Sequence, residues 1–102
     1  MTKVVAYVPD LMDRSRLAGA ADVIFVDRPA ALAATAADHN ADVVVVDLTR
    51  PGVLEAISSV PGRVLGFANH TERDLLESAR AAGCEQALAR SAFFSRLPDL
   101  LG

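Results

Sequence analysis

The chain carries the same seven-residue pattern twice, ADVIFVD at residues 21–27 and ADVVVVD at residues 41–47. In each copy, a run of β-branched or aromatic residues is closed by an aspartate, and apolar and polar side chains do not alternate within the run. Uninterrupted runs of this kind are typical of strands that are covered on both faces in a parallel sheet. The spacing of the copies fits one strand, one helix and two short loops. The repeat therefore predicts two successive strand–helix units.

Three further apolar runs bring the number of predicted strands to five. They lie at residues 4–8, 63–67 and 86–89. Helical stretches separate the strands, and strict alternation with short connections predicts right-handed crossovers and a parallel sheet. We expect one α/β domain over residues 1–102, a doubly wound five-stranded parallel sheet in the flavodoxin-like order 2-1-3-4-5.

Capping residues indicate where the helices begin and end. Asp10 is placed to cap the first helix. Thr71 with Asp74 resembles a capping box, Ser91 is placed to cap the last helix, and Pro98 is expected to bend that helix. The five predicted helices run over about residues 11–21, 29–39, 52–60 and 71–83, and from residue 91 onward.

Composition and charge restrict the class of partner and the compartment. The 102 residues are 52% hydrophobic and 23% charged, and ten basic residues stand against thirteen acidic ones, for a net charge of -3. Nucleic acids and anionic membrane surfaces both need clustered Lys and Arg, so we expect neither as a partner. The lone Cys84 cannot form an internal disulfide, and the apolar run at residues 4–8 is too short for a signal peptide or a membrane span. These features predict a cytoplasmic protein.

The carboxyl ends of the strands are where ligands bind in such sheets, near the point at which the strand order reverses. The predicted order brings Asp10, after the first strand, close to Asp47, after the third. Two carboxylates there could hold a hard cation such as Mg²⁺. The turn after the first strand reads VPDLMD and lacks glycine, which excludes a dinucleotide fingerprint. The sequence also lacks a Walker loop, a metal-type Cys/His spacing and a nucleophile elbow, so we predict no enzyme.

Two segments resemble the receiver domains of bacterial response regulators. The segment VDLTRPG at residues 46–52 is similar to the phospho-acceptor loop of that family, a strand that ends in Asp and is followed by a short loop with proline. The segment ARAAGCEQALAR at residues 79–90 is similar to the family's stretch from the fourth helix through the fifth strand to a basic residue. The spacings from Asp47 agree, and the resemblance covers essentially the whole chain. It implies a receiver-like fold and a role in signal transduction within a two-component system or phosphorelay.

Carried over residue by residue, the resemblance implies an eroded phosphorylation site. Asp47 falls on the phospho-acceptor position, and Asp10 supplies at best one member of the acid pair that helps to bind Mg²⁺. Ala68 stands where the family has a Thr or Ser that contacts the phosphoryl group. Ala87 replaces the aromatic residue of the fifth strand, and Arg90 replaces the lysine that follows it. Arg90 keeps the charge but differs from lysine in reach and geometry.

Three functions remain open from these residues. The first is a stand-alone, degenerate pseudo-receiver that acts by protein–protein interaction, with weak or no phosphorylation and little or no Mg²⁺ binding. The second is a working receiver in which Asp47 accepts a phosphoryl group from a histidine kinase with the help of Mg²⁺. The third is a small-ligand-binding or enzymatic flavodoxin-like domain that uses Asp10, Asp47 and His70. Partners of the first kind are a histidine kinase, an output protein or a second copy of the chain.

Structural roles compete with each of these site assignments. Asp47 could be an ordinary loop carboxylate, and Asp10 only a helix cap. Arg90 could pair directly with Asp47 in place of a cation. Phe93 and Phe94 are adjacent on the last helix and point about 100° apart, so we expect one of them to be only partly buried. Such an exposed apolar surface would favour a homodimer.

Overall fold

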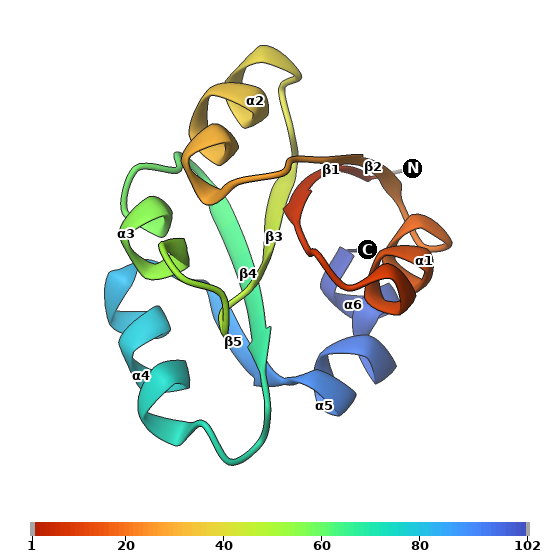
Figure 1. The fold of residues 1–102 in the computed structure, drawn as a ribbon. Helices are drawn as coiled ribbons and strands as arrows, with labels where there is room; N and C mark the ends of the chain where they lie inside the picture. The colour runs from red at the N-terminus through yellow and green to blue at the C-terminus, as the bar shows by residue number, and fades with distance from the viewer. Residues whose placement is uncertain (1, 102) are drawn as a thin grey trace.

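A parallel five-stranded sheet in the order β2-β1-β3-β4-β5 forms the centre of the computed structural model, which describes residues 2–101 (Figure 1). All four pairs of neighbouring strands are parallel. This confirms the predicted fold class and strand order. The strands are β1 (Lys3–Tyr7), β2 (Asp22–Phe25), β3 (Val43–Asp47), β4 (Arg63–Ala68) and β5 (Gln86–Ala89).

Helices cover both faces of the sheet. Figure 1 shows α2, α3 and α4 on one face and α1, α5 and α6 on the other. None of the helices between residues 2 and 101 is long and apolar enough to cross a membrane. The helices are α1 (Leu11–Ala18), α2 (Leu32–Asp38), α3 (Val53–Ile57), α4 (Arg73–Ala82), α5 (Arg90–Ser95) and α6 (Leu97–Leu101), and a 3-10 turn η1 (Pro29–Ala31) precedes α2.

The valine run of β3 supplies both cores at once. Successive side chains of a strand point to opposite faces of its sheet. Val44 and Val46 therefore pack in the core under α2, α3 and α4. Val43 and Val45 pack in the core under α1, α5 and α6. All four are at most 2% exposed, which explains why the sequence of this central strand shows no polar alternation.

Two of the predicted helix caps are wrong. Helix α4 begins at Arg73 and has no side-chain cap, so Thr71 lies in the preceding turn and forms no capping box. Helix α5 begins at Arg90, directly after β5, so Ser91 lies inside its first turn. Because the strand passes straight into the helix, no loop residue is left to act as a cap.

The predicted bend at Pro98 is a break between two short helices. Helix α5 ends at Ser95, and α6 begins at Leu97, with Arg96 between them. Proline is tolerated in the first turn of a helix, where its missing N–H group costs no hydrogen bond, but not in a helix interior. Pro98 therefore lies at the second position of α6 rather than inside a single long helix.

Candidate functional site

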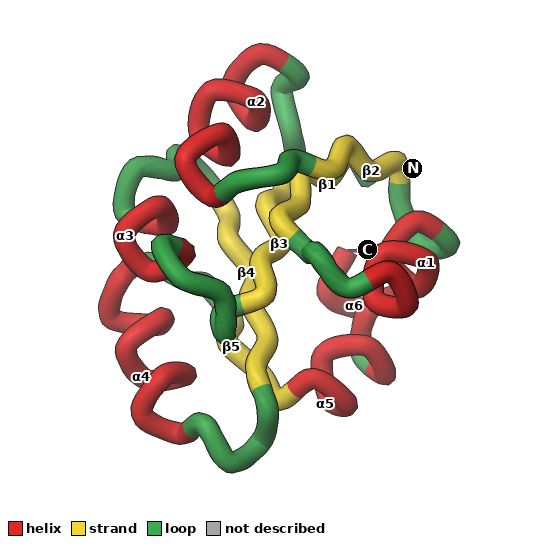
Figure 2. Tube along the Cα trace, viewed as in Figure 1, coloured by secondary structure: helices red, strands yellow, loops and turns green. Residues whose placement is uncertain are grey.

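Asp47 is the last residue of β3, and its side chain is buried at the carboxyl end of the sheet. The β3–α3 loop, green in Figure 2, follows it directly. Oδ1 of Asp47 accepts hydrogen bonds from the backbone N–H of Thr49 at 3.0 Å and from the Thr49 hydroxyl at 2.6 Å. Its Oδ2 accepts a longer one from Nε of Arg50 at 3.3 Å. The carboxylate is therefore held by its own loop, whatever else it binds.

Arg90 lies between Asp47 and a second buried carboxylate, that of Asp13. Its Nη1 donates a hydrogen bond to Oδ2 of Asp13, and its Nη2 lies 3.9 Å from Oδ2 of Asp47. The guanidinium carbon also lies 4.9 Å from the centre of the Phe67 ring, which is fully buried. Arg90 does approach Asp47, but its closer partner is Asp13. Arg90 thus bridges the two carboxylates.

Asp13 is a member of this site that was not predicted from the sequence. It lies in the first turn of α1, and its side chain is only 6% exposed. A spacing of four residues puts it on the same face of α1 as the fully buried Leu17, and that face meets the sheet. This spacing was the available signal. This signal was missed because charged residues are rarely buried in a helix without a partner, and the partner of Asp13, Arg90, lies 77 residues away in the sequence.

Asp10 is an exposed helix cap. Its Oδ1 accepts a hydrogen bond from the backbone N–H of Asp13 at 3.0 Å, which confirms the predicted cap of α1. This hydrogen bond is the main cause that lowers the pKa of Asp10 below its usual value of 3.8, and the positive charges of Arg90 and Arg50 add smaller effects in the same direction.

The residues at this end of the sheet do not fit a divalent cation. Between residues 2 and 101, no group of three His, Cys, Asp or Glu side chains is close enough to hold a metal ion. Asp13 and Asp47 are both already in contact with the guanidinium of Arg90. Mg²⁺ requires several oxygen ligands in near-octahedral geometry. The two acids offer such oxygens only after Arg90 has moved away.

Ala68 and Ala87 fill space inside the fold. Ala68 is the last residue of β4, is paired with Ala89 of β5 and is fully buried. Its methyl group offers no hydrogen bond to a group bound at Asp47. Ala87 is also fully buried and packs in the core on the α4 side of the sheet. Neither position carries the side chain that the family resemblance led us to look for.

A glycine in β4 fixes the loop that follows Asp47. The side chain of Leu48 packs directly over Gly66, so that a Cβ atom added to this glycine would lie 2.8 to 2.9 Å from three Leu48 carbons. The backbone N–H of Leu48 also donates to the carbonyl oxygen of Phe67 at 2.9 Å. These two contacts anchor the start of the loop, and neither was predicted from the sequence.

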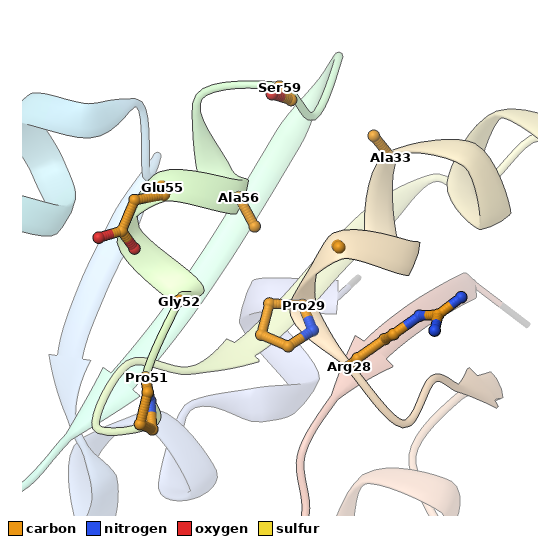
Figure 3. Close-up of a pocket in the computed structure, with 9 residues that line it drawn as sticks. Arg28, Pro29, Ala33, Pro51, Gly52, Glu55, Ala56 and Ser59 are labelled. Carbon is orange, nitrogen blue, oxygen red and sulfur yellow. The ribbon is translucent and has the colours of Figure 1, made fainter.

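A shallow pocket lies between η1, the start of α2 and α3 (Figure 3). Arg28 and Glu55 stand at its sides, and Figure 3 shows their side chains pointing away from each other. None of Asp10, Asp47 and His70 lines this pocket, so it gives no support to a ligand site built from those three. Small residues line most of it, namely Pro29, Ala30, Ala33, Pro51, Gly52, Ala56 and Ser59.

Solved structures of response regulators superpose on nearly the whole chain. The chemotaxis protein CheY4 from Vibrio cholerae is 18% identical, with a TM-score of 0.80 over 99% of this chain and 96% of that one. The chain has the receiver fold. A response regulator from Hahella chejuensis is 16% identical, with a TM-score of 0.81 over 99% of this chain and 92% of that one. The Mn²⁺-bound response regulator Rcp1 is 14% identical, with a TM-score of 0.65 over 98% of this chain and 91% of that one. The sequence of this chain matches no family model, and it matches no curated protein.

Proposed function

We propose that this chain is a degenerate receiver-like signalling domain of the cytoplasm that acts by protein–protein contact and not as an enzyme. In this proposal Asp47 is phosphorylated weakly or not at all. The observation that carries it is the position of Arg90, whose guanidinium group contacts both Asp13 and Asp47.

Arg90 opposes the binding of a metal ion at this site. A cation that used Asp13 and Asp47 would have to displace the guanidinium from both carboxylates and from the face of Phe67. The three contacts belong to one side chain, so they would be lost together. Charge-assisted contacts of this kind are stronger than neutral ones. Weak Mg²⁺ binding is therefore the expected behaviour of the native chain.

The surroundings of Asp47 also disfavour the attachment of a phosphoryl group to its side chain. Such a group would bring close to two negative charges near Asp13, which is buried. The methyl group of Ala68 replaces a hydrogen-bond donor, and each missing charge-assisted hydrogen bond forfeits about 1.5 to 3 kcal/mol. Arg50 and Arg90 offset part of this loss. Phosphorylation is therefore expected to be weak rather than absent.

The partner in this proposal is another protein, either a histidine kinase, an output protein or a second copy of the chain. A working receiver is the second candidate function. Two observations favour it: Asp47 lies at the end of β3, and similar solved structures include the Mn²⁺-bound Rcp1 and the phosphorylated cyanobacterial phytochrome response regulator RcpA. This alternative needs a divalent cation beside Asp47.

A titration with paramagnetic Mn²⁺ separates the two functions. Bound Mn²⁺ broadens the amide NMR signals of nearby residues, here those of Leu48 and Thr49. We expect no saturable broadening in the native chain up to millimolar Mn²⁺, and saturable broadening in Arg90→Gln, because this variant frees both carboxylates. Asp47→Asn is the matched control. Saturable broadening of the native chain at micromolar Mn²⁺ that disappears in Asp47→Asn would favour the working receiver.

A further inference from the structure

The outward face of α1 carries no charged side chain. Asp13 and Leu17 are the buried residues of this helix, so they define the face that meets the sheet. Leu11 and Met12 are 78% and 73% exposed, and no other large hydrophobic residue is exposed in the part of the chain that the structure describes. At 100° per residue, the positions opposite the buried pair are Leu11, Met12, Ser15, Ala18 and Gly19, all of them exposed.

The charged side chains of α1 are used elsewhere. Asp13 pairs with Arg90, and Nε of Arg14 donates to the carbonyl oxygen of Val8 at 2.6 Å. Arg16 lies at the side of the helix, with its guanidinium carbon 5.4 Å from the centre of the Phe94 ring. A surface helix normally turns its charged residues to solvent. Here the solvent-facing stripe carries none, and such an exposed apolar patch is typical of a binding surface.

A groove lies beside this stripe, between α1 and the helices α5 and α6, which lie next to it in Figure 1. Arg16 of α1 and Gly19, which directly follows this helix, line it from one side, and Phe94, Leu97 and Pro98 line it from the other. Gly19 has no side chain to fill this space. The same face of the molecule therefore carries two protruding apolar side chains at the start of α1 and an open, partly apolar groove at its end.

We propose that a second copy of this chain covers this face, with the two α1 helices antiparallel about a two-fold axis. Leu11 and Met12 of each copy then enter the groove of the other. A two-fold interface uses the same surface on both subunits. The protruding side chains of each copy therefore contact the groove of the other, and this contact occurs twice in the dimer. The inference rests on the proposed role in protein–protein contact and names a second copy as the partner.

Charge complementarity supports this occupant. Asp10 directly precedes the two protruding residues and is exposed, whereas Arg16 lines the groove. When Leu11 enters the opposite groove, Asp10 approaches the partner's Arg16. The two-fold axis makes this pairing occur twice. Opposite charges that meet across an interface fix its register and exclude wrong partners.

The phenylalanines contribute to the fold more than to this interface. From the sequence, we expected an apolar surface at Phe93 and Phe94 that would favour a homodimer. Phe93 is fully buried, and Phe94 is half-buried, with ring centres 5.2 Å from Phe93 and 5.3 Å from Phe67. Only the remaining exposed part of Phe94 is open to a partner, as one wall of the groove. The proposed interface is therefore centred on α1.

Sedimentation equilibrium of the native chain tests the proposal first. We expect a mass of twice the 10.7 kDa chain at the higher concentrations. The double variant Leu11→Glu/Met12→Glu should weaken the dimer by about 100-fold or more, because two buried apolar side chains are lost from each copy. The matched control is Ala37→Glu, an exposed position on α2, which should leave the dimer unchanged. Circular dichroism and thermal unfolding check that each variant is folded.

Two further variants address the groove and the axis. Gly19→Leu should also dissociate the dimer, since it fills the groove from a position where an added Cβ has no neighbour closer than 3.6 Å. Ser15→Cys, near the two-fold axis, should form a disulfide-linked dimer under mild oxidation, whereas Ala37→Cys should not. The native Cys84 is buried and does not compete.

Two results would overturn the proposed interface. One is a monomer mass for the native chain up to millimolar concentration. The other is a dimer of Leu11→Glu/Met12→Glu that is as tight as the native one, which would place the interface elsewhere. None of these variants changes Asp47, Asp13 or Arg90, so the Mn²⁺ titration judges the proposed function separately from the dimer.

Discussion

Replacing Arg90 with alanine removes the cation that lies between two buried carboxylates. The side chains of Asp13 and Asp47 are 6% and 1% exposed in the native fold. Among residues 2–101, only Arg50, at 3.3 Å from Asp47, then remains as a cation in contact with either. Removing one partner from a buried ion pair costs about 3 to 5 kcal/mol. Arg90 itself is 34% exposed, so solvent screening lowers the expected loss to about 2 to 3 kcal/mol.

Thermal and urea unfolding measure this loss. For a domain of this size, 2 to 3 kcal/mol corresponds to a decrease in Tm of roughly 10 to 20 °C.

Two further variants act as controls for Arg90→Ala. Arg90→Lys keeps the charge but not the planar two-sided contact, so it should recover only part of the stability. The double variant Asp13→Asn/Arg90→Ala removes one buried charge together with the cation, and it should be more stable than Arg90→Ala alone. A loss below about 0.5 kcal/mol for Arg90→Ala would refute the reasoning, since surface substitutions have effects of that size.

Three other predictions concern Asp10, Gly66 and Cys84. The pKa of Asp10 is lowered in the folded chain, so this carboxylate stabilises the fold at a pH above its usual pKa of 3.8, and the stabilisation is lost as the pH falls below that value. Urea unfolding of the native chain should show this loss of stability at low pH, and Asp10→Asn should show a smaller loss. Asp10→Ala should have a lower unfolding midpoint than the native chain at pH 7. Gly66→Ala should destabilise the fold by about 1 to 3 kcal/mol through its clash with Leu48, and Leu48→Ala in the same chain should recover part of the loss. Burial raises the pKa of the Cys84 thiol from 9.0 to about 11, so labelling by a disulfide reagent at pH 8 should be at least about 100-fold slower in the folded chain than in urea; equal rates would contradict this.

The strand pattern was sufficient to predict the fold because it is a local property. Residues 21–27 and 41–47 have a composition typical of strands in a parallel sheet, although only β3 is buried throughout and the edge strand β2 is partly exposed. Alternation with helices then restricts the topology to a few choices. Asp47 could be placed at the carboxyl end of the sheet for the same reason. Helix ends were less predictable, since Thr71 and Ser91 have the chemistry of caps but lie outside or inside the actual first turns.

The contacts within the site depend on residues that are distant in the sequence. Asp13 is part of the site only because α1 and α5 lie side by side, which brings Arg90 to it from the other end of the chain. The pairing of Gly66 with Leu48 likewise depends on the neighbouring positions of β3 and β4. No local pattern reports such a pair. The sequence therefore predicted the kinds of residue at this end of the sheet, but not which of them are in contact.

The reactivity of Asp47 toward a small phosphodonor tests the central claim most directly. The native chain and Asp47→Asn are incubated with acetyl phosphate and excess Mg²⁺, beside a receiver domain with the full set of site residues as a positive control, and intact masses are followed with time. We predict that only a small fraction of the native chain gains the mass of one phosphoryl group while the control is fully modified. Stoichiometric modification of the native chain that is absent in Asp47→Asn would contradict the account and establish a working phospho-acceptor.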